Sequence, residues 1–435
     1  MPEDRSVARS RGGAADIYEQ HHGGSRMIKG ALDKGQTWTR LLRLPSSDEE
    51  NAVFSESSSS ASVPTDVASE PCAIPTAATV EHNSPDQVEN PHMPWSDSEP
   101  EEVWATAPSQ VLRPLSFAPD PGGTLLLPPW NSQRFRFWKV HMLAARSGGQ
   151  VELYLDFMTG GTVAVKHLPR SRLMESPQAY QEAWAGEVEN PWKEIEIMMR
   201  FGLPGPDRLA GVAQSFGAFC TERGDGMLVS EYLPGGDLFD IAAKLDEPGL
   251  KRELQVCPII MSLLQAVRSL HARGVAHGDI SLENALLRRG SQVVLIDFAM
   301  AVTDNVDTAT GRRGKPSYMA PEMFTQRTYD ARAADVFACG VCAYALAMGS
   351  YPWVSTRPGA CLAFVFAQRF GLQALLQRRR LAATPRRPRT PIGTCMSAAF
   401  RQNLVMMLAM DSARRPKLHE YVSYEVLQKG WAATE

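Results

Sequence analysis

One lysine and one glutamate stand where they could meet beside a phosphate. The stretch 161–168 alternates apolar β-forming residues with Lys166, so it predicts a strand that buries one face and delivers an ammonium near its end. Asn190 and the proline after it are typical of a helix start. On that helix Glu194 and Met198 share a face, because they are four residues apart. A carboxylate so placed could hold Lys166 against a polyphosphate.

A second group of polar residues follows further along the chain. A long amphipathic helix is expected at about 253–273, closed by Gly274, and Asp279 and Asn284 come shortly after it. Asp297 ends a short apolar strand. Aspartate and asparagine supply hard oxygen ligands, which suit Mg²⁺ bound jointly with phosphate oxygens. Taken singly, each of these residues could instead be an ordinary capping or turn residue.

The composition of the chain changes sharply along its 435 residues. Between residues 46 and 112 there are thirteen Asp or Glu and no Lys or Arg, in a background of Ser, Pro, Ala and Thr. Such a stretch cannot bury enough apolar surface to offset the entropy of ordering. We therefore expect a disordered acidic, Ser/Pro-rich tail over 1–125 and one folded domain over 134–430.

Charge and cysteine content narrow the class of protein. The formal net charge of −3 hides an acidic tail before a basic domain, and no nucleic-acid partner is expected. No apolar run has the length of a signal peptide core or a membrane span, so we expect an intracellular protein, cytoplasmic or nuclear, without a membrane partner.

Seven scattered cysteines fit a reduced compartment. Cys339 and Cys342 form a C-x-x-C inside an apolar helical stretch, where two small core residues are favoured over a metal or redox site.

Taken in order, these motifs resemble the protein-kinase signature set: Val-Ala-Val-Lys166, Glu194 on the next helix, His277-x-Asp279-x-x-x-x-Asn284, Asp297-Phe-x and Ala320-Pro-Glu322. The resemblance covers roughly residues 134 to 430. It implies an α+β, bilobal fold with a small β-rich N-lobe, about 134–230, carrying one main helix. A larger, mainly helical C-lobe would follow, about 234–430. The implied activity is that of a serine/threonine kinase, which transfers the ATP γ-phosphoryl group to hydroxyls of protein substrates with Mg²⁺.

The resemblance also implies roles for single residues. Lys166 would bind the α- and β-phosphates, and Glu194 would position Lys166. Asp279 would accept the substrate hydroxyl proton, while Asn284 and Asp297 would hold the metal ions. The implied nucleotide-binding positions are Gly149 in the phosphate-covering loop, Val151, Ala164 and Leu286 around adenine, and Glu231 to Leu233 in the hinge. Arg415 resembles the partner of Glu322 in a buried ion pair.

Several positions depart from the family pattern. The phosphate-covering loop keeps only the last of three glycines, Gly149, which puts its nucleotide affinity in doubt. Ala299 replaces the glycine of Asp-Phe-Gly. Gly278 replaces the arginine before the catalytic aspartate, so activation is expected not to depend on loop phosphorylation. A lysine and a hydroxyl have exchanged places, as Ser281 and Lys315, and Lys315 is expected roughly 3 to 4 Å from Asp279 and Ser281.

This combination is similar to divergent kinases of alveolate protists, including the FIKK-like group, although the group's naming tetrapeptide is absent and the subfamily stays open. Two other functions remain possible. One is a pseudokinase scaffold with weak or no catalysis, and the other is an interaction hub built on the acidic tail. Tyrosine specificity is disfavoured, because neither the segment after Asp279 nor that around Lys315 resembles the tyrosine-kinase versions.

A run of arginines lies in the expected C-lobe. It is interpreted as an exposed loop that is either solvated surface, sometimes a nuclear-targeting signal, or a docking patch for an anionic partner. That partner would be an acidic substrate or the chain's own acidic tail. The run comprises Arg378, Arg379, Arg380, Arg386, Arg387 and Arg389.

Overall fold

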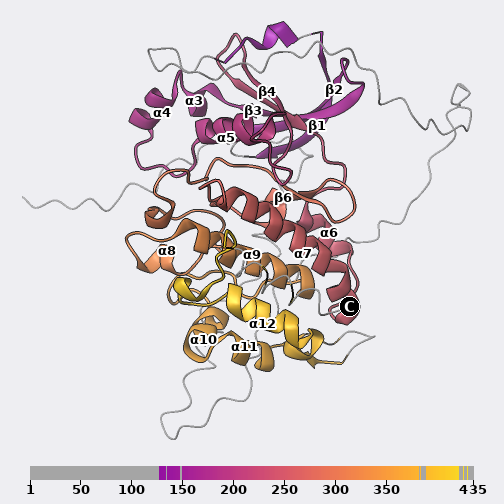
Figure 1. The fold of residues 1–435 in the computed structure, drawn as a ribbon, viewed down its shortest axis with the longest axis vertical. Helices are drawn as coiled ribbons and strands as arrows, with labels where there is room; N and C mark the ends of the chain where they lie inside the picture. The colour runs from indigo at the N-terminus through magenta and orange to yellow at the C-terminus, as the bar shows by residue number, and fades with distance from the viewer. Residues whose placement is uncertain are drawn as a thin grey trace, which may run out of the picture. The chain divides into compact units, whose positions relative to one another are not determined.

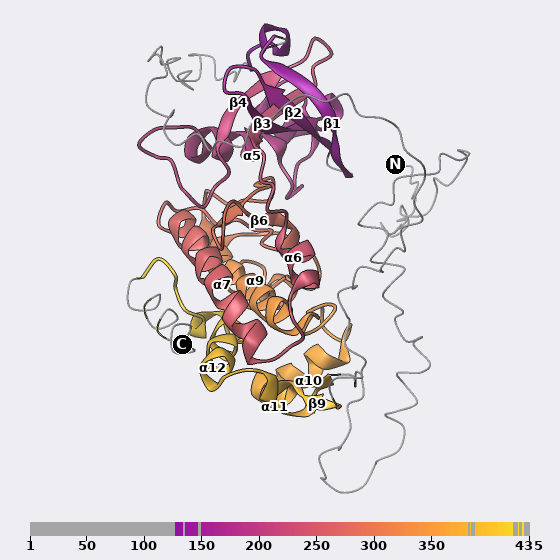
Figure 2. The same ribbon diagram turned by 90° about the vertical axis from the view of Figure 1, so that its right-hand side faces the viewer.

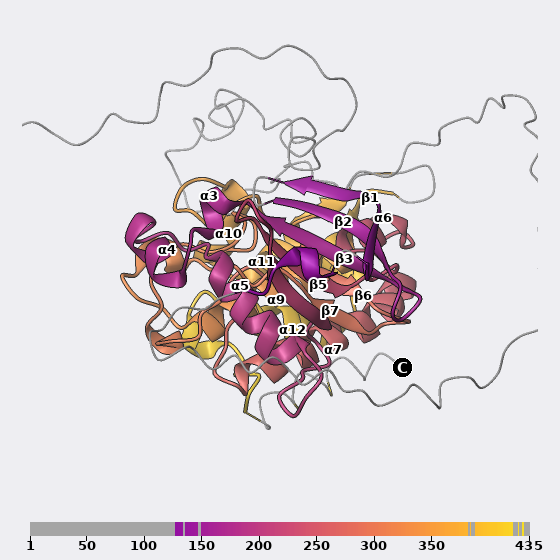
Figure 3. The same ribbon diagram turned by 90° about the horizontal axis from the view of Figure 1, so that it is seen from above.

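A sheet of five antiparallel strands forms the first part of the fold (Figure 1). The computed structural model describes residues 127–133, 135–146, 149–381, 383, 388–420, 425 and 429. In the sheet the strands follow the order β1-β2-β3-β5-β4, and Figure 3 shows β1, β2 and β3 side by side. Their bounds are β1 Phe137–Arg146, β2 Gly149–Asp156, β3 Gly161–Leu168, β4 Ser215–Cys220 and β5 Gly226–Glu231.

Helix α5 (Pro191–Ile197) lies between β3 and β4 in the sequence and carries Glu194. Its start is as expected, because the Asn190 side chain accepts a hydrogen bond from the Trp192 N–H and Pro191 occupies the first turn. A π-helical turn, Met198–Gly202, continues it. Two short helices precede it, α3 (Arg170–Leu173) and α4 (Pro177–Ala183).

The second part of the fold is mainly helical. Its long helices α7 (Leu250–His271) and α9 (Ala331–Met348) pack against each other, as Figure 2 shows. Helix α7 begins three residues before the predicted start at 253 and ends two residues before the predicted end at 273. The remaining elements are α6 Leu238–Lys244, β6 Ala285–Leu287, β7 Val293–Leu295, α8 Glu322–Thr325, α10 Leu362–Phe370, α11 Leu372–Arg378, β8 Arg380–Leu381, β9 Thr390–Pro391 and α12 Ala398–Met407.

Helix α9 is the centre of this second part. Every residue in it except Arg332 and Ala333 is buried. Gly340 permits the approach of α12, because a Cβ there would stand 2.8 Å from the Leu408 side chain. By length and composition alone α9 could cross a membrane, so the statement that no apolar run has the length of a span does not hold for this helix. Yet 89% of that window is buried inside the fold, and a buried core helix passes the same test.

The arginine run is not the uniformly exposed loop that its composition suggested. Arg379 is buried, with 5% of its surface exposed, and its Nη1 donates to the carbonyl oxygens of Tyr351 at 3.1 Å and Pro352 at 2.6 Å. These bonds satisfy the guanidinium inside the protein, so Arg379 belongs to the structural core. Arg386 and Arg387 lie outside the described residues.

Residues 127–133, which precede the expected domain boundary at 134, pack against the sheet. Trp130 stacks on Phe137 with ring centroids 5.6 Å apart and meets Tyr154 and Phe219 edge-on. The Cys220 N–H donates to the carbonyl of residue 128 at 2.9 Å, which fixes the segment along β4. One face of the sheet is thereby covered by a segment that sequence patterns did not single out.

We expect Trp130→Ala to lower the free energy of unfolding by about 2 kcal/mol, because it removes three aromatic contacts and leaves a cavity over the sheet. Denaturant unfolding measures this. Trp138→Ala is the matched control, since Trp138 on β1 is 65% exposed and should change stability little. Equal losses in the two variants would show that Trp130 contributes no more than an exposed tryptophan.

Candidate active site

Lys166 is held between two carboxylates. Its Nζ lies 2.7 Å from both Oε atoms of Glu194 and 3.1 Å from Oδ1 of Asp297. Lys166 belongs to β3 and pairs with Val151 on β2 and Leu228 on β5, so its backbone is fixed from both sides. The two carboxylates come from α5 and from the turn after β7. The structure therefore brings together three predicted site residues from distant parts of the sequence.

Two carboxylates compete for this one ammonium, Glu194, which is buried, and Asp297, which is partly exposed. Burial alone would raise the pKa of Asp297, but Lys166 offsets it and holds that pKa below its usual value. Burial raises the pKa of Glu194 to about 7, because the attraction of Lys166 is partly cancelled by the negative charge of Asp297. The pKa of Lys166 is raised by both carboxylates against the opposing effect of burial, so the lysine is charged throughout the physiological range.

The loop that carries Asp279 is fixed by a buried aspartate at the start of α9. The Asp335 carboxylate accepts hydrogen bonds from the backbone N–H groups of His277, at 2.7 Å, and Gly278, at 2.9 Å. Its Oδ2 also lies 2.9 Å from Nε2 of His271. The His277 ring packs on Phe298, with centroids 4.8 Å apart. His277, two residues before Asp279, and Phe298, the residue after Asp297, are thus joined through one tilted ring contact.

Asp279 and Asn284 hold each other. Nδ2 of Asn284 donates to Oδ2 of Asp279 at 2.7 Å and to its backbone carbonyl at 2.9 Å. The other carboxylate oxygen of Asp279, Oδ1, is buried and has no hydrogen-bond partner among the described residues. Burial raises the pKa of Asp279, while Lys315 acts in the opposite direction. An oriented carboxylate with one unused oxygen is suited to accept a proton.

The donor set fits a hard cation. Because the amide nitrogen of Asn284 is used by Asp279, its amide oxygen is left as a ligand, and Asp297 supplies carboxylate oxygens. Asp297 adopts φ 64°, a conformation that costs a non-glycine residue roughly 1–3 kcal/mol. Strain of this kind is common at functional sites, where the surroundings hold the residue in place.

Lys315 reaches the same site from the segment before α8. Its Nζ lies 2.6 Å from Oγ of Ser281, 3.7 Å from Oδ2 of Asp279 and 3.8 Å from Oε2 of Glu283. The ammonium thus lies near both residues named from the sequence, at distances close to the expected range. Glu283 was missed, although its position just before Asn284 could have signalled it.

Two of the predicted adenine-binding positions lie on neighbouring strands, and the third lies on β6 in a separate sheet. Val151 on β2 and Ala164 on β3 belong to strands paired in the sheet, and Ala164 pairs with Ser230 on β5. Leu286, on β6, forms an isolated bridge with Asp237, which ties the C-lobe hairpin to the segment after β5.

The hinge segment shows which groups a nucleotide could use. The Glu231 side chain accepts a hydrogen bond from Nε of Arg288 at 2.9 Å, and its N–H donates to the Gln214 carbonyl. The side chain of Glu231 therefore has a structural role. Sequence analysis missed this role and also missed its partner, Arg288. The N–H groups of Tyr232 and Leu233 both have no acceptor among the described residues, so two donors in this segment are open.

Gly149 has a structural reason to be glycine. It adopts φ 133°, and a Cβ there would lie 2.0 Å from the carbonyl oxygen of His167 on β3. Close packing of two strands therefore requires glycine even without a phosphate. The two residues before it, Ser147 and Gly148, lie outside the described residues.

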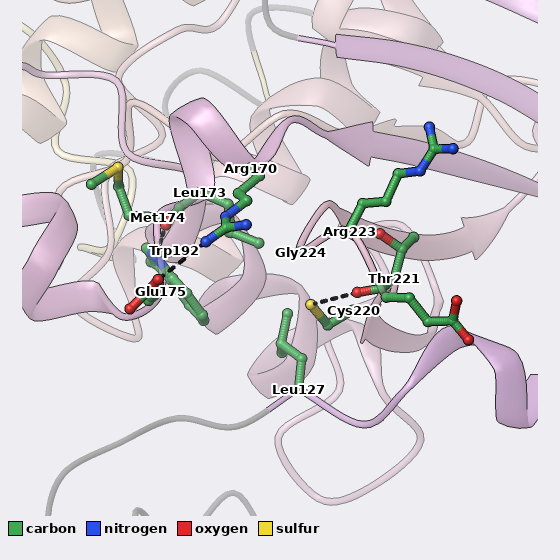
Figure 4. Close-up of a pocket in the computed structure, with 11 residues that line it drawn as sticks. Leu127, Arg170, Leu173, Met174, Glu175, Trp192, Cys220, Thr221, Arg223 and Gly224 are labelled. Atoms are coloured by element: carbon green, nitrogen blue, oxygen red, sulfur yellow. Dashed lines mark hydrogen bonds and ion pairs between the residues drawn. The ribbon is translucent and has the colours of Figure 1, made fainter.

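A cavity of about 370 Å³ lies away from these residues, beside α3 and the turn between β4 and β5 (Figure 4). It is lined by Leu127, Arg170, Leu173, Met174, Glu175, Trp192, Cys220, Thr221, Glu222, Arg223 and Gly224. None of these is a predicted site residue, so the cavity is separate from the candidate active site.

Several known proteins resemble this chain. A kinase called CBL-interacting protein kinase 16, from Oryza sativa subsp. japonica, is 27% identical over 63% of this chain and 53% of its own length. The CBL-interacting serine/threonine-protein kinase 18 of Arabidopsis thaliana is 30% identical over 47% of this chain and 36% of its own. The serine/threonine-protein kinase 36 of Mus musculus is 30% identical over 51% of this chain and 15% of its own. The matched regions thus span about half or less of these relatives.

A family model described as the protein kinase domain matches residues 143–427, which is well over half of the chain. The match includes every predicted site residue and both parts of the fold, and it confirms the bilobal α+β architecture expected from the motifs. With the Lys166, Asp279 and Asp297 groups assembled as described, the chain belongs to the protein kinase domain family.

Proposed function

We propose that this chain is a protein serine/threonine kinase that transfers the γ-phosphoryl group of ATP to hydroxyls of protein substrates. The observation that carries the proposal is the position of Lys166, whose Nζ contacts Glu194 and Asp297 at 2.7 and 3.1 Å. The groups that would bind phosphate and metal are therefore already in contact. The names of the relatives, which are serine/threonine or CBL-interacting kinases, support the substrate class.

In this mechanism Lys166 binds the α- and β-phosphates and Glu194 fixes its direction. Asn284 and Asp297 would hold Mg²⁺, which would supply positive charge against the transferred phosphoryl group. Asp279 orients the acceptor hydroxyl and takes its proton, and its Oδ1 has no other hydrogen-bond partner among the described residues. Nδ2 of Asn284 donates to the other oxygen, Oδ2, at 2.7 Å.

Lys315 adds a cation beside the acceptor site. Because its Nζ is 3.7 Å from Asp279 and bonded to Ser281, it can stabilise negative charge that develops as the hydroxyl attacks. The ammonium comes from the segment before α8, whereas most of the surrounding groups come from the loop after α7. The exchange of lysine and hydroxyl therefore keeps a cation beside Asp279.

A pseudokinase is the second candidate, and the structure contains one observation that favours it. β1 runs to Arg146 and β2 begins at Gly149, so two of the expected glycine positions, Ala144 and Arg146, lie in β1. Weak nucleotide binding would follow from side chains at positions where glycine lets the backbone approach phosphates. Binding of Mg·ATP without transfer to any peptide would identify this function.

We also propose an intracellular location, cytoplasmic or nuclear, and an anionic partner for the arginine run. The six cysteines among the described residues are free, which supports a reducing compartment. Arg380 and Arg389 are exposed, so a basic surface remains after Arg379 is excluded. The partner would be an acidic substrate or the acidic residues of 1–125.

The first prediction concerns catalysis. Asp279→Asn and Asp297→Asn should each lower kcat by about 10² to 10⁴, because one removes the proton acceptor and the other a metal ligand. A peptide-library phosphorylation assay with Mg·ATP measures this, and unchanged unfolding midpoints show that both variants fold. Activity equal to wild type in both variants would refute the kinase proposal.

Lys315→Ala should lower kcat at least tenfold while leaving the dissociation constant for Mg·ATP nearly unchanged. The reason is that Lys315 contacts Asp279 and Ser281 but neither Lys166 nor Asp297. Lys251→Ala is the control, since it removes an exposed lysine that pairs with Asp246. An equal loss in nucleotide affinity and rate would mean that Lys315 supports the fold of the site instead.

Nucleotide binding should depend on pH through Glu194. Its pKa of about 7 lies above the usual value, so below pH 7 it is protonated and its ion pair with Lys166 is lost. A metal ion at Asp297 would neutralise the negative charge that helps to raise the pKa of Glu194. Binding of Mg·ATP should therefore release the proton of Glu194 between about pH 5 and 7. Affinity for Mg·ATP should fall as the pH drops below 7.

Calorimetry at pH 6 in two buffers of different ionisation enthalpy measures the proton released. Glu194→Gln cannot ionise, so it should remove the protein's share of that release. If the variant and the wild type release the same number of protons, Glu194 is not the group that titrates.

If the acidic tail docks on the arginine run across the substrate cleft, removing residues 1–125 should raise activity at low salt. Exposed charges are screened over about 8 Å at physiological ionic strength, so the gain should shrink as salt is added. The assay compares full-length and truncated protein over a salt series. An unchanged rate with unchanged salt dependence would leave the run without this role.

A further inference from the structure

The space beside Gly278 is filled by another part of the chain. Gly278 adopts φ 77°, and a Cβ there would lie 2.3 Å from the carbonyl oxygen of Met300 and 3.4 Å from Cδ of Arg313. No side chain fits at this position without moving the backbone after Asp297. The loop that carries Asp279 therefore leaves room for an arginine that comes from the segment before α8.

Arg313 uses that room to join two distant backbone segments. Its Nη1 donates to the carbonyl oxygen of Val188 at 3.0 Å and to that of Met300 at 3.1 Å. Nε of Arg313 is buried and has no hydrogen-bond partner among the described residues. Both backbone partners of the guanidinium are neutral acceptors.

The two joined segments lead directly to the site. Val188 lies two residues before Asn190, the N-cap of α5, and α5 carries Glu194. Met300 lies three residues after Asp297. A backbone bond runs parallel to the arginine bridge, since the Asn190 N–H donates to the Ala299 carbonyl at 2.7 Å.

A third contact joins the same elements from the surface of α5. Nζ of Lys193 donates to Oγ1 of Thr303 at 2.7 Å and also lies 2.9 Å from Oε2 of Glu196. The start of α5 is thus tied to the segment after Asp297 by a backbone bond, by Lys193 and by Arg313. Of these three ties, Arg313 is the one in which a single group bonds to both segments.

We propose that Arg313 is a positioning residue that holds the start of α5 against the segment after Asp297. It thereby sets the distance between Glu194 and Asp297, the two carboxylates that share Lys166. Gly278 has no side chain that could join these two segments, and Arg313 joins them instead. Its hydrogen-bond acceptors are backbone carbonyl oxygens, so the contact does not depend on a phosphorylated residue. The kinetic consequence rests on the proposed kinase function, whereas the effect on α5 does not.

The chemistry of the acceptors defines the variants. Carbonyl oxygens require N–H donors and not a positive charge, so Arg313→Lys and Arg313→Gln should retain much of the tie, and Arg313→Leu should lose it. Arg312→Leu is the matched control, because Arg312 is the exposed neighbour and its guanidinium lies over the Phe324 ring, 5.7 Å from the centroid.

The test combines hydrogen exchange with nucleotide binding on the full chain. In Arg313→Leu, amides of α5 should exchange about tenfold faster, and a non-hydrolysable Mg·ATP analogue should bind about tenfold more weakly. The Lys and Gln variants should lie close to wild type, and Arg312→Leu should match it. Phosphatase treatment of the wild type should change neither measurement.

The proposal is overturned if a folded Arg313→Leu protein exchanges at α5 and binds nucleotide as the wild type does. If that variant does not fold, the Lys and Gln variants decide, and the same losses in both despite normal unfolding midpoints would also overturn it. A wild type that binds no nucleotide would count against the kinase function alone, because exchange at α5 still tests the role of Arg313.

Discussion

The ammonium of Lys166, shared by Glu194 and Asp297, is the contact on which the rest of the site depends. It can form only when β3, α5 and the turn after β7 meet at one point. Removing one partner leaves a charge without its counter-charge, and this is most costly at Glu194, whose side chain is buried. The packing of the two parts of the fold is therefore coupled to the geometry of the site.

The neighbouring polar groups make that geometry rigid and also explain the unusual residues of this chain. Asp335 fixes the backbone around Gly278, and Asn284 fixes Asp279. Lys315 and Arg313 both come from the segment before α8 and approach the loop at positions where that loop itself has Ser281 and Gly278. The loop that carries Asp279 has no cation at these two positions. The cations beside it are Lys315 and Arg313, from the segment that precedes α8.

Local signals in the sequence predicted much of this arrangement. The N-cap at Asn190 and the strand ending near Lys166 follow from residue preference and alternation, and both are present. Packing between distant residues was not predictable. Arg379 is buried against carbonyls from a remote loop, and Gly149 is required by the His167 carbonyl on the neighbouring strand. Such contacts depend on tertiary approach, which neither composition nor spacing encodes.

The most direct test of the central claim is single-turnover transfer of labelled γ-phosphate from Mg·ATP to a protein or peptide acceptor, followed by phosphoamino-acid analysis. With Lys166, Asp279 and Asp297 assembled as described, the label should appear on serine or threonine at a rate that depends on Mg²⁺. Nucleotide that binds without any transfer, or label that appears on tyrosine alone, would contradict this account.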